Sequence, residues 1–218
     1  NFLQFNHVIL CVPFRKDTIW LECTSQKIPF GFLGDFTDDR DVLIIDEDGG
    51  KFAHTKRYEA NDNIRSCKAE FLIDSTGTAS CNIRTVMQGL QYDNIMGLLG
   101  SNYEEQKKWL YSISTLPAIQ IKKFLIGESG KSNPSATINE SSVSKNFCSF
   151  SGSYMILPLN LVNVQKPLQK MLKPRKSDIL ISRSFIDWDT LVYRIPKSYL
   201  YETLPAGTNI NSVFGSFT

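Results

Sequence analysis

The chain has 218 residues, 42% of them hydrophobic, which is enough to bury a core and to form one or two domains. Its formal net charge is +2, from 24 basic and 22 acidic residues, so it lacks the large basic excess of a dedicated nucleic-acid-binding protein. No apolar run approaches the roughly 20 residues that a helix needs to span a bilayer, so no membrane span is expected.

The N-terminal quarter of the chain predicts short β-hairpins. Four runs are rich in β-branched and aromatic residues and are separated by turn residues: 7–12, 19–24, 42–45 and 51–54. The polar segment 57–63 is the predicted domain boundary. We therefore expect residues 1–56 to form one small β-hairpin unit and residues 60–218 to form a second domain.

A longer hairpin is predicted directly after this boundary. Apolar and polar residues alternate over 69–73 and again over 79–85, and Asp74-Ser75-Thr76-Gly77 lies between the two runs. If the turn is centred on Ser75 and Thr76, Phe71 faces Cys81 across the hairpin. Cys67 is then out of register with Cys81, which argues against a disulfide between them.

One helix is predicted over residues 103–114. Trp109, Leu110 and Ile113 share one face of this helix with Gln106. Ser101 or Asn102 is the expected N-cap.

The rest of the chain is expected to be mainly strand. The predicted strands share short apolar runs bounded by turn residues: 119–126, 147–157, 179–185, 191–195, 199–204 and 212–218. The runs 179–185 and 191–195 are expected to form a hairpin around Asp187-Trp188-Asp189. Residues 163–177 are expected to form an irregular basic loop. The last run, 212–218, is expected to be a strand cut before its partner. The fold class expected is mainly β, with a β-sandwich-like second domain that carries one helix and is truncated at its C-terminal end.

The five cysteines indicate free thiols rather than a zinc site or a disulfide framework. Their number is odd, no CxxC pair is present, and the chain has only two histidines. Cys11 and Cys23 lie on adjacent predicted strands, as do Cys67 and Cys81, so either pair could be close. Buried thiols are the favoured interpretation, because a free cysteine packs as a small hydrophobe.

Three other polar patterns favour an ordinary solvated surface over a binding site. They are the acidic stretch at 35–48, the basic cluster at 166–176 and the glycosylation-like triplet Asn139-Glu140-Ser141. The acidic stretch lacks the ligand spacing of a calcium loop, and the basic cluster lacks interleaved aromatic residues. No metal and no cofactor is predicted.

The strongest candidate site is the pair His7 and Glu22. They lie on adjacent predicted strands, in Phe5-Asn6-His7-Val8-Ile9-Leu10 and Trp20-Leu21-Glu22-Cys23-Thr24. A carboxylate in an apolar strand needs a partner, and an imidazole held by a carboxylate can act as a general base. A structural pair that only joins two strands is the alternative.

These two segments resemble the histidine and acid strands of the transglutaminase-like fold, with Glu22 in place of the family's aspartate. Further likeness extends over Pro29-Phe30-Gly31, residues 89–94 and residues 189–196. In these segments the chain resembles bacterial proteins in which a β-sandwich domain of unknown function follows a transglutaminase-like core. Residues 1–56 would then be the C-terminal strands of that core.

The resemblance implies a Cys-His-acid protein of the acyltransferase, amidase or protease kind, with His7 as base and Glu22 as its orienting acid. The family's nucleophilic cysteine precedes the histidine strand, so the 218-residue chain alone is expected to be inactive and to work with the remainder of the core. The family likeness also implies export to the periplasm or cell envelope. The alternative function is a non-catalytic β-sandwich module that binds a protein or glycan partner at the cell envelope.

Overall fold

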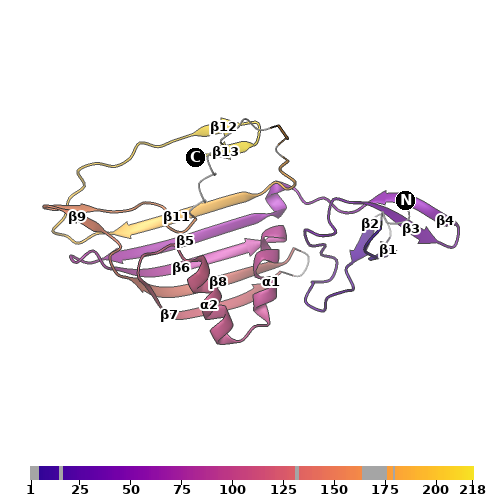
Figure 1. Cartoon of the computed structure of the whole chain (residues 1–218), viewed down its shortest axis with the longest axis horizontal. Helices are drawn as coiled ribbons and strands as arrows, with labels where there is room; N and C mark the ends of the chain where they lie inside the picture. The colour runs from indigo at the N-terminus through magenta and orange to yellow at the C-terminus, as the bar shows by residue number, and fades with distance from the viewer. Residues whose placement is uncertain (1–4, 15–16, 131–132, 164–175, 179) are drawn as a thin grey trace.

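The computed structural model describes residues 5–14, 17–130, 133–163, 176–178 and 180–218. The described chain is mainly β, as predicted, and is built around one five-stranded sheet with the strand order β11-β5-β6-β8-β7 (Figure 1). These strands are Ile64–Ile73 (β5), Ala79–Gln88 (β6), Ile119–Ser129 (β7), Ser135–Ser144 (β8) and Ile186–Arg194 (β11).

Two hairpins precede this sheet and lie beyond one end of it (Figure 1). The first pairs β1 (Leu10–Phe14) with β2 (Asp17–Leu21), and the second pairs β3 (Asp41–Asp46) with β4 (Gly49–His54). The prediction of two N-terminal hairpins is confirmed. The first ladder stops at the pair Leu10 and Leu21, so the segments with His7 and Glu22 continue just past its end.

The β5–β6 hairpin has the register expected from the sequence, with Phe71 opposite Cys81 and Cys67 opposite Thr85. The Asp74 carboxylate accepts hydrogen bonds from the backbone N–H groups of Thr76 and Thr78, which fixes the turn. All five cysteines are free thiols. Cys67, Cys81 and Cys148 are buried as predicted, whereas Cys11 is half-buried and Cys23 is exposed: the prediction of burial fails for these last two.

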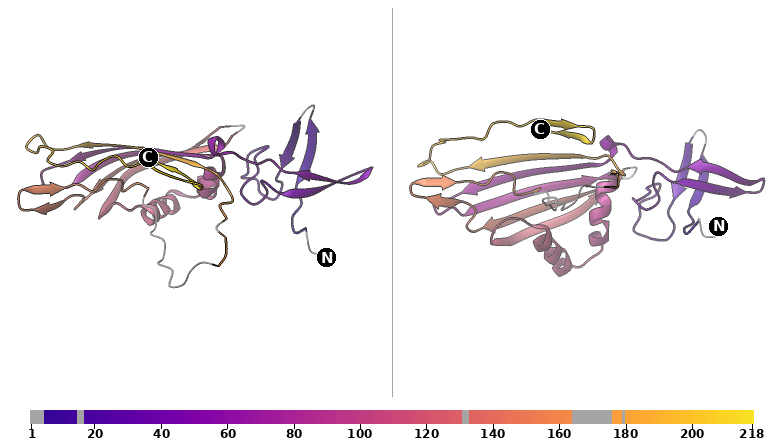
Figure 2. Two further views of the ribbon diagram at one scale, coloured as in Figure 1. Left: turned by 90° about the horizontal axis from the view of Figure 1, so that it is seen from above. Right: turned by 45° about the horizontal axis from the view of Figure 1, so that its top comes forward.

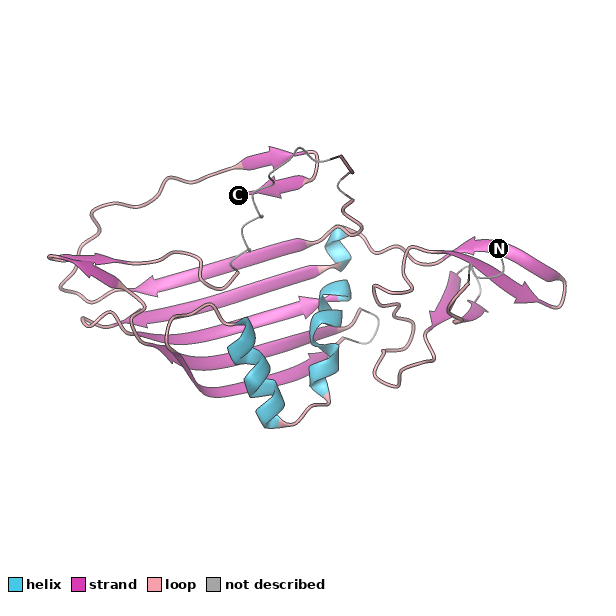
Figure 3. Ribbon diagram, in the orientation of Figure 1, coloured by secondary structure: helices cyan, strands magenta, loops and turns pink. Residues whose placement is uncertain are grey.

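Helices cover one face of the sheet, and no helix of the described residues packs on the other face, called the uncovered face below (Figures 2 and 3). The predicted helix is present as α2 (Tyr103–Ile113), and the Asn102 side chain caps it by accepting from the Glu105 N–H. A short 3₁₀ helix, η2 (Gly89–Tyr92), leads into a second helix, α1 (Asp93–Leu99), which the sequence did not predict. The layer packed on the large sheet is therefore helical, within a fold that is mainly β as predicted.

In the middle of the chain one strand was not predicted and one predicted strand is wrong. Strand β8 was missed because its residues are mostly serine, threonine and asparagine, with little apolar alternation. It nevertheless lies between β6 and β7 in the sheet. The strand predicted at 147–157 is a small hairpin of β9 (Ser149–Ser151) and β10 (Tyr154–Ile156), because Gly152 turns the chain at a φ of +59°.

The C-terminal hairpin predicted around Asp187-Trp188-Asp189 is also wrong. These residues lie inside one strand, β11, which pairs in parallel with β5. Both aspartates find partners within the fold, since Arg65 binds Asp189 at 2.9 Å and Gln91 donates to Asp187 at 3.0 Å. Of the earlier predicted strand at 179–185, residue 179 lies outside the described residues and 180–185 is not strand.

The last residues form a further hairpin. The strand predicted at 199–204 is not present, and β12 (Ile210–Ser212) pairs with β13 (Gly215–Phe217). The strand predicted at the C-terminus thus has its partner within the chain. Most of the predicted basic loop at 163–177 lies outside the described residues.

The buried hydrophobic residues form two clusters. The first joins Trp20, Phe32 and Tyr58 of the N-terminal region to Tyr92 and other residues of the sheet domain. The short 3₁₀ helix η1 (Ala60–Asp62) connects the two regions. The second cluster centres on Phe71, which is fully buried and whose ring stacks on those of Phe147 and Tyr193. No helix within the described ranges is long and apolar enough to cross a membrane.

Candidate functional site

The first hairpin brings His7 and Glu22 together. If the β1–β2 ladder is continued by one step past Leu10 and Leu21, Glu22 faces Ile9. His7 lies two residues before Ile9 and so projects to the same side of the hairpin as Ile9. The result is a hydrogen bond of 2.6 Å between His7 Nε2 and Glu22 Oε2. The sequence-predicted pair is therefore formed in the structure.

Glu22 is held by a second set of contacts. Its other oxygen, Oε1, accepts from the Thr24 N–H at 3.0 Å and from the Thr24 hydroxyl at 2.7 Å. Only 4% of the Glu22 side chain is exposed. Burial acts to raise the pKa of Glu22, but the hydrogen bonds from Thr24 and His7 outweigh it and hold the pKa below the ordinary value of 4.5. Glu22 is thus a fixed, ionised carboxylate at neutral pH.

The hydrogen bond with Glu22 determines which nitrogen of His7 can act as a base. An ionised carboxylate only accepts hydrogen bonds, so a neutral imidazole in this contact carries its proton on Nε2. The Nδ1 lone pair is then available, and Nδ1 has no hydrogen-bond partner among the described residues. The edge-to-face contact with Phe36, with ring centroids 4.9 Å apart, restrains the imidazole further.

A cavity of about 330 Å³ adjoins His7. Its walls include the aromatic rings of Phe5 and Phe36, the side chain of Val42 and the guanidinium-bearing residue Arg40. Phe36 and Arg40 were not predicted as site residues. Their sequence context, an acidic turn-like stretch, gave no sign that they approach the histidine. The cavity can take an apolar group together with a polar group that accepts hydrogen bonds.

None of the five cysteines lines this cavity. Burial raises the pKa of Cys67 and Cys148 and raises that of Cys81 to about 11, so these three remain protonated at neutral pH. Cys23 is exposed, and its thiol lies 3.6 Å from the Leu21 carbonyl oxygen. No thiol within the chain is therefore placed to act with His7.

Carboxylates of the acidic stretch 35–48 pair with basic side chains of the chain instead of forming an open cation site. His54, the second histidine, lies between Asp39 and Asp41, with each ring nitrogen 2.8 Å from a carboxylate oxygen. The Asp39 and Asp41 carboxylates raise the pKa of His54. The described part of the chain contains no group of three or more His, Cys, Asp or Glu side chains that could hold a metal ion.

Comparisons with models of protein families, with curated proteins and with solved structures gave no match. The interpretation of the site therefore depends on its own geometry and on the sequence motifs.

Replacing Glu22 with glutamine should change how stability depends on pH. The folded-state pKa of Glu22 is below 4.5, so its ionised form stabilises the protein above pH 4.5, and this contribution is lost as the pH falls through the folded-state pKa. At pH 7 we expect the substitution to lower the free energy of unfolding by about 1.5–3 kcal/mol, the range for hydrogen bonds to a charged group.

Urea unfolding of both proteins between pH 7 and pH 3 measures this effect. The difference between wild type and Glu22→Gln should be largest at neutral pH and should shrink below pH 4.5. Glu47→Gln, at an exposed position in the β3–β4 turn, is the matched control and should show no such trend. A difference that stays constant or grows on acidification would contradict the prediction.

Proposed function

We propose that His7 and Glu22 are the base and the orienting acid of a Cys-His-acid site in a transglutaminase-like protein. The nucleophilic cysteine would come from polypeptide outside these 218 residues. The observation that supports this most directly is the 2.6 Å hydrogen bond from His7 Nε2 to Glu22, which leaves Nδ1 free to accept a proton.

The chemistry would be acyl transfer or amide hydrolysis. The thiol gives its proton to His7 Nδ1, and the thiolate attacks the carbonyl carbon of an amide. The tetrahedral intermediate collapses when the protonated imidazole gives its proton to the departing amine, which leaves a thioester. An incoming amine or water, deprotonated by Nδ1, then attacks the thioester and releases the thiol. Glu22 stabilises the imidazolium in each half-reaction.

The glutamate in place of the family's aspartate is compatible with this function. A glutamate side chain has one more rotatable bond than an aspartate, so it orients an imidazole less strictly when it is unrestrained. Here the two hydrogen bonds from Thr24 to Oε1 fix the carboxylate and leave Oε2 for His7. Thr24 thus supplies the restraint that the longer side chain needs.

An amine-incorporation assay tests the proposal. The chain is expressed together with the polypeptide that precedes it in its gene product, and transfer of a fluorescent alkylamine to casein is followed. His7→Ala should lower the rate by about 10²–10⁴-fold, the usual contribution of a general base. His54→Ala is the control for the loss of a histidine, because His54 is the chain's other histidine and does not itself line the cavity beside His7, although its partner Asp41 does.

The 218-residue chain alone should show no transfer. Turnover by this chain that is abolished by His7→Ala would overturn the proposal that the nucleophile comes from elsewhere. Equal rates for the His7→Ala protein and the unsubstituted longer protein would overturn the proposed role of His7.

A second candidate function is partner binding at the cell envelope by the uncovered face of the sheet. By strand register this face carries Trp188, Leu72 and Val192, with relative exposures of 64%, 58% and 44%. An exposed tryptophan on a face that also exposes aliphatic side chains favours contact with a protein or a glycan. Retention on peptidoglycan or on envelope protein fractions, reduced by Trp188→Ser, would support it. Failure to bind either material would count against it.

A further inference from the structure

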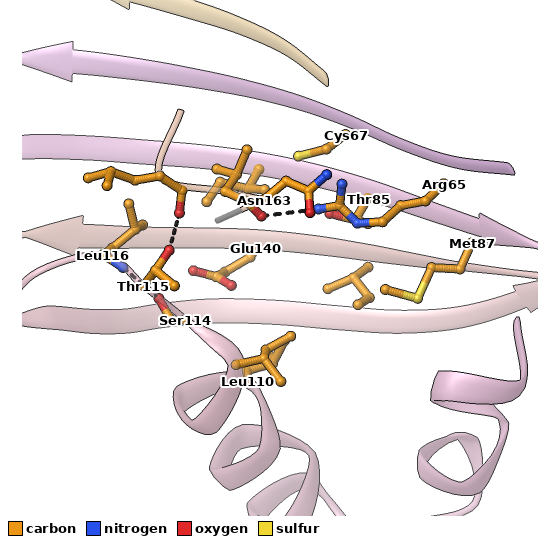
Figure 4. Close-up of a pocket in the computed structure, with 15 residues that line it drawn as sticks. Arg65, Cys67, Thr85, Met87, Leu110, Ser114, Thr115, Leu116, Glu140 and Asn163 are labelled. Carbon is orange, nitrogen blue, oxygen red and sulfur yellow. Dashed lines mark hydrogen bonds between the residues drawn. The ribbon is translucent and has the colours of Figure 1, made fainter. Parts of the chain in front are cut away.

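A second cavity lies in the sheet domain, between α2 and the helix-covered face of the sheet (Figure 4). It has a volume of about 250 Å³ and is lined by residues of β5, β6, β8, α2 and the segment 161–163. It shares no lining residue with the cavity beside His7. An inference about it therefore does not depend on the proposed acyl-transfer function.

Glu140 points into this cavity from β8 (Figure 4). Its Oε1 atom is shielded from solvent and has no hydrogen-bond partner among the described residues. Burial raises the pKa of this carboxyl group above its ordinary value and outweighs the opposing effect of the nearby Ser142 hydroxyl, which itself lacks a hydrogen-bond partner of good geometry among the described residues. A buried polar atom without a partner costs free energy, and native proteins rarely keep one without a reason. The cavity thus contains an acceptor that is ready for a donor.

The charges around the cavity favour a cation as that donor. The guanidinium of Arg65 is already engaged, at 2.9 Å from Asp189 and 3.1 Å from the Val162 carbonyl oxygen. Asp187, on the same face of β11 as Asp189, receives hydrogen bonds from the uncharged amides of Gln91 and Asn163. Among the described residues, the carboxylates of Glu140, Asp187 and Asp189 lie on the same face of the sheet as one guanidinium, that of Arg65, and the net charge of these four groups is negative when all three carboxylates are ionised.

The remaining walls of the cavity are partly polar, from Thr85, Ser114, Thr115 and Asn163, and partly apolar. Ile83, Met87, Leu110 and Ile138 contribute side chains around the carboxyl group. Pockets for drug-sized ligands usually measure about 300–1,000 Å³, so a cavity below that range suits a molecule of only a few heavy atoms. The small volume, the apolar side chains and the buried carboxyl group together favour a ligand with a short hydrocarbon chain and one cationic donor group.

We propose that this cavity binds a small primary alkylammonium ion. Its ammonium group donates hydrogen bonds to Glu140, and its alkyl chain packs against Leu110 and Ile138. The ligand would supply the missing partner of Oε1 and would offset the excess negative charge at the same time.

Titration of the 218-residue chain with n-butylammonium, followed by amide chemical shifts, tests the proposal. Saturable shifts are expected at residues that line the cavity, such as Cys67, Thr85 and Leu110. n-Butanol has the same shape without the charge, and we expect it to bind about tenfold more weakly, because it cannot form the charge-assisted hydrogen bond. Glu140→Gln should weaken n-butylammonium binding by a similar factor.

Glu70→Gln is the matched control. It removes a carboxylate from β5 of the same sheet, on the face opposite the cavity, where Glu70 pairs with Arg194, and it should leave n-butylammonium binding unchanged. The ¹³C shift of the Glu140 carboxyl group provides a measurement that needs no variant. Saturating n-butylammonium should make this group ionise at a lower pH, because the ammonium favours the charged form.

Three results would overturn the proposal. One is the absence of saturable shifts at the cavity. Another is binding of n-butanol as tight as that of n-butylammonium. The third is n-butylammonium binding that is unaffected by Glu140→Gln, together with a Glu140 titration that is unaffected by the ligand.

Discussion

Alanine at position 89 is expected to lower the free energy of unfolding by about 2–5 kcal/mol. Gly89 has a φ of +62°, a conformation that costs an L-residue about 1–2 kcal/mol. A Cβ atom at this position would lie 2.1 Å from the Asp62 carbonyl oxygen and 2.7 Å from Asn63 Oδ1. The backbone itself would have to move to relieve this overlap, at a further cost of about 1–3 kcal/mol.

The loss of stability on substitution of Gly89 should be large because Gly89 lies where several segments meet. Its N–H donates to the Pro134 carbonyl oxygen, and the next N–H, of Leu90, donates to Asn63 Oδ1. Asn63 in turn donates to the Ser184 carbonyl oxygen and accepts from the Ile186 N–H through its own backbone. A displacement at Gly89 therefore disturbs the junction of β5, β6, β8 and β11.

Gly152→Ala is the matched control in urea unfolding. Gly152 has nearly the same φ, +59°, but an added Cβ would meet nothing within 4 Å. It should show only the conformational cost of about 1–2 kcal/mol. Equal losses for the two variants would mean that the close approach to Asp62 is unimportant. A loss at Gly89 of more than 1 kcal/mol beyond that at Gly152 would support the steric argument.

Arg183→Met is expected to lower the free energy of unfolding by about 3–5 kcal/mol, the usual cost of leaving a buried charge without its partner. The Arg183 guanidinium binds the carboxylate of Asp38 and the carbonyl oxygen of Asp35. Asp38 is only 1% exposed. Asp93 is close enough for its pKa to respond to both Asp38 and Arg183, so removing the guanidinium leaves the buried Asp38 carboxylate near the half-buried carboxyl group of Asp93.

Two further variants separate this effect from a general loss of charge. Arg194→Met removes an arginine from an exposed pair with Glu70, with side-chain exposures of 64% and 45%, and should cost less than about 1 kcal/mol. Adding Asp38→Asn to Arg183→Met should recover much of the lost stability, because it removes the unpaired charge. Equal losses for Arg183→Met and Arg194→Met in urea unfolding would contradict the prediction.

The parts of the fold that could be predicted from the sequence depend on local patterns. The register of Phe71 and Cys81 follows from strict alternation on both sides of one turn, and α2 follows from its cap and its apolar face. Strand β8 could not be predicted in this way. Small residues such as Ala136 and Ser144 suffice for its buried face, because helices and neighbouring strands enclose it. β11 was misassigned because Asp187 and Asp189 are typical of turns, and the partners that satisfy them lie far away in the sequence.

The two candidate sites differ in the same way. His7 and Glu22 are only 15 residues apart on one hairpin, so their contact could be expected from the strand pattern. The cavity around Glu140 is assembled from β5, β6, β8 and α2, and no local motif marks it. In the sequence, Glu140 is notable only as the middle residue of the triplet Asn139-Glu140-Ser141.

The position of β11 also sets the order in which the sheet can form. Strands β5, β6, β7 and β8 join through antiparallel pairs, whereas β11 pairs in parallel with β5, and its Asp189 meets Arg65 from 124 residues further along the chain. Contacts of such high sequence separation form late and slowly. During synthesis, the nascent protein therefore passes through a four-stranded stage, with an open β5 edge and with Phe71 lacking the ring of Tyr193. This stage is the one most exposed to edge-to-edge association on the ribosome.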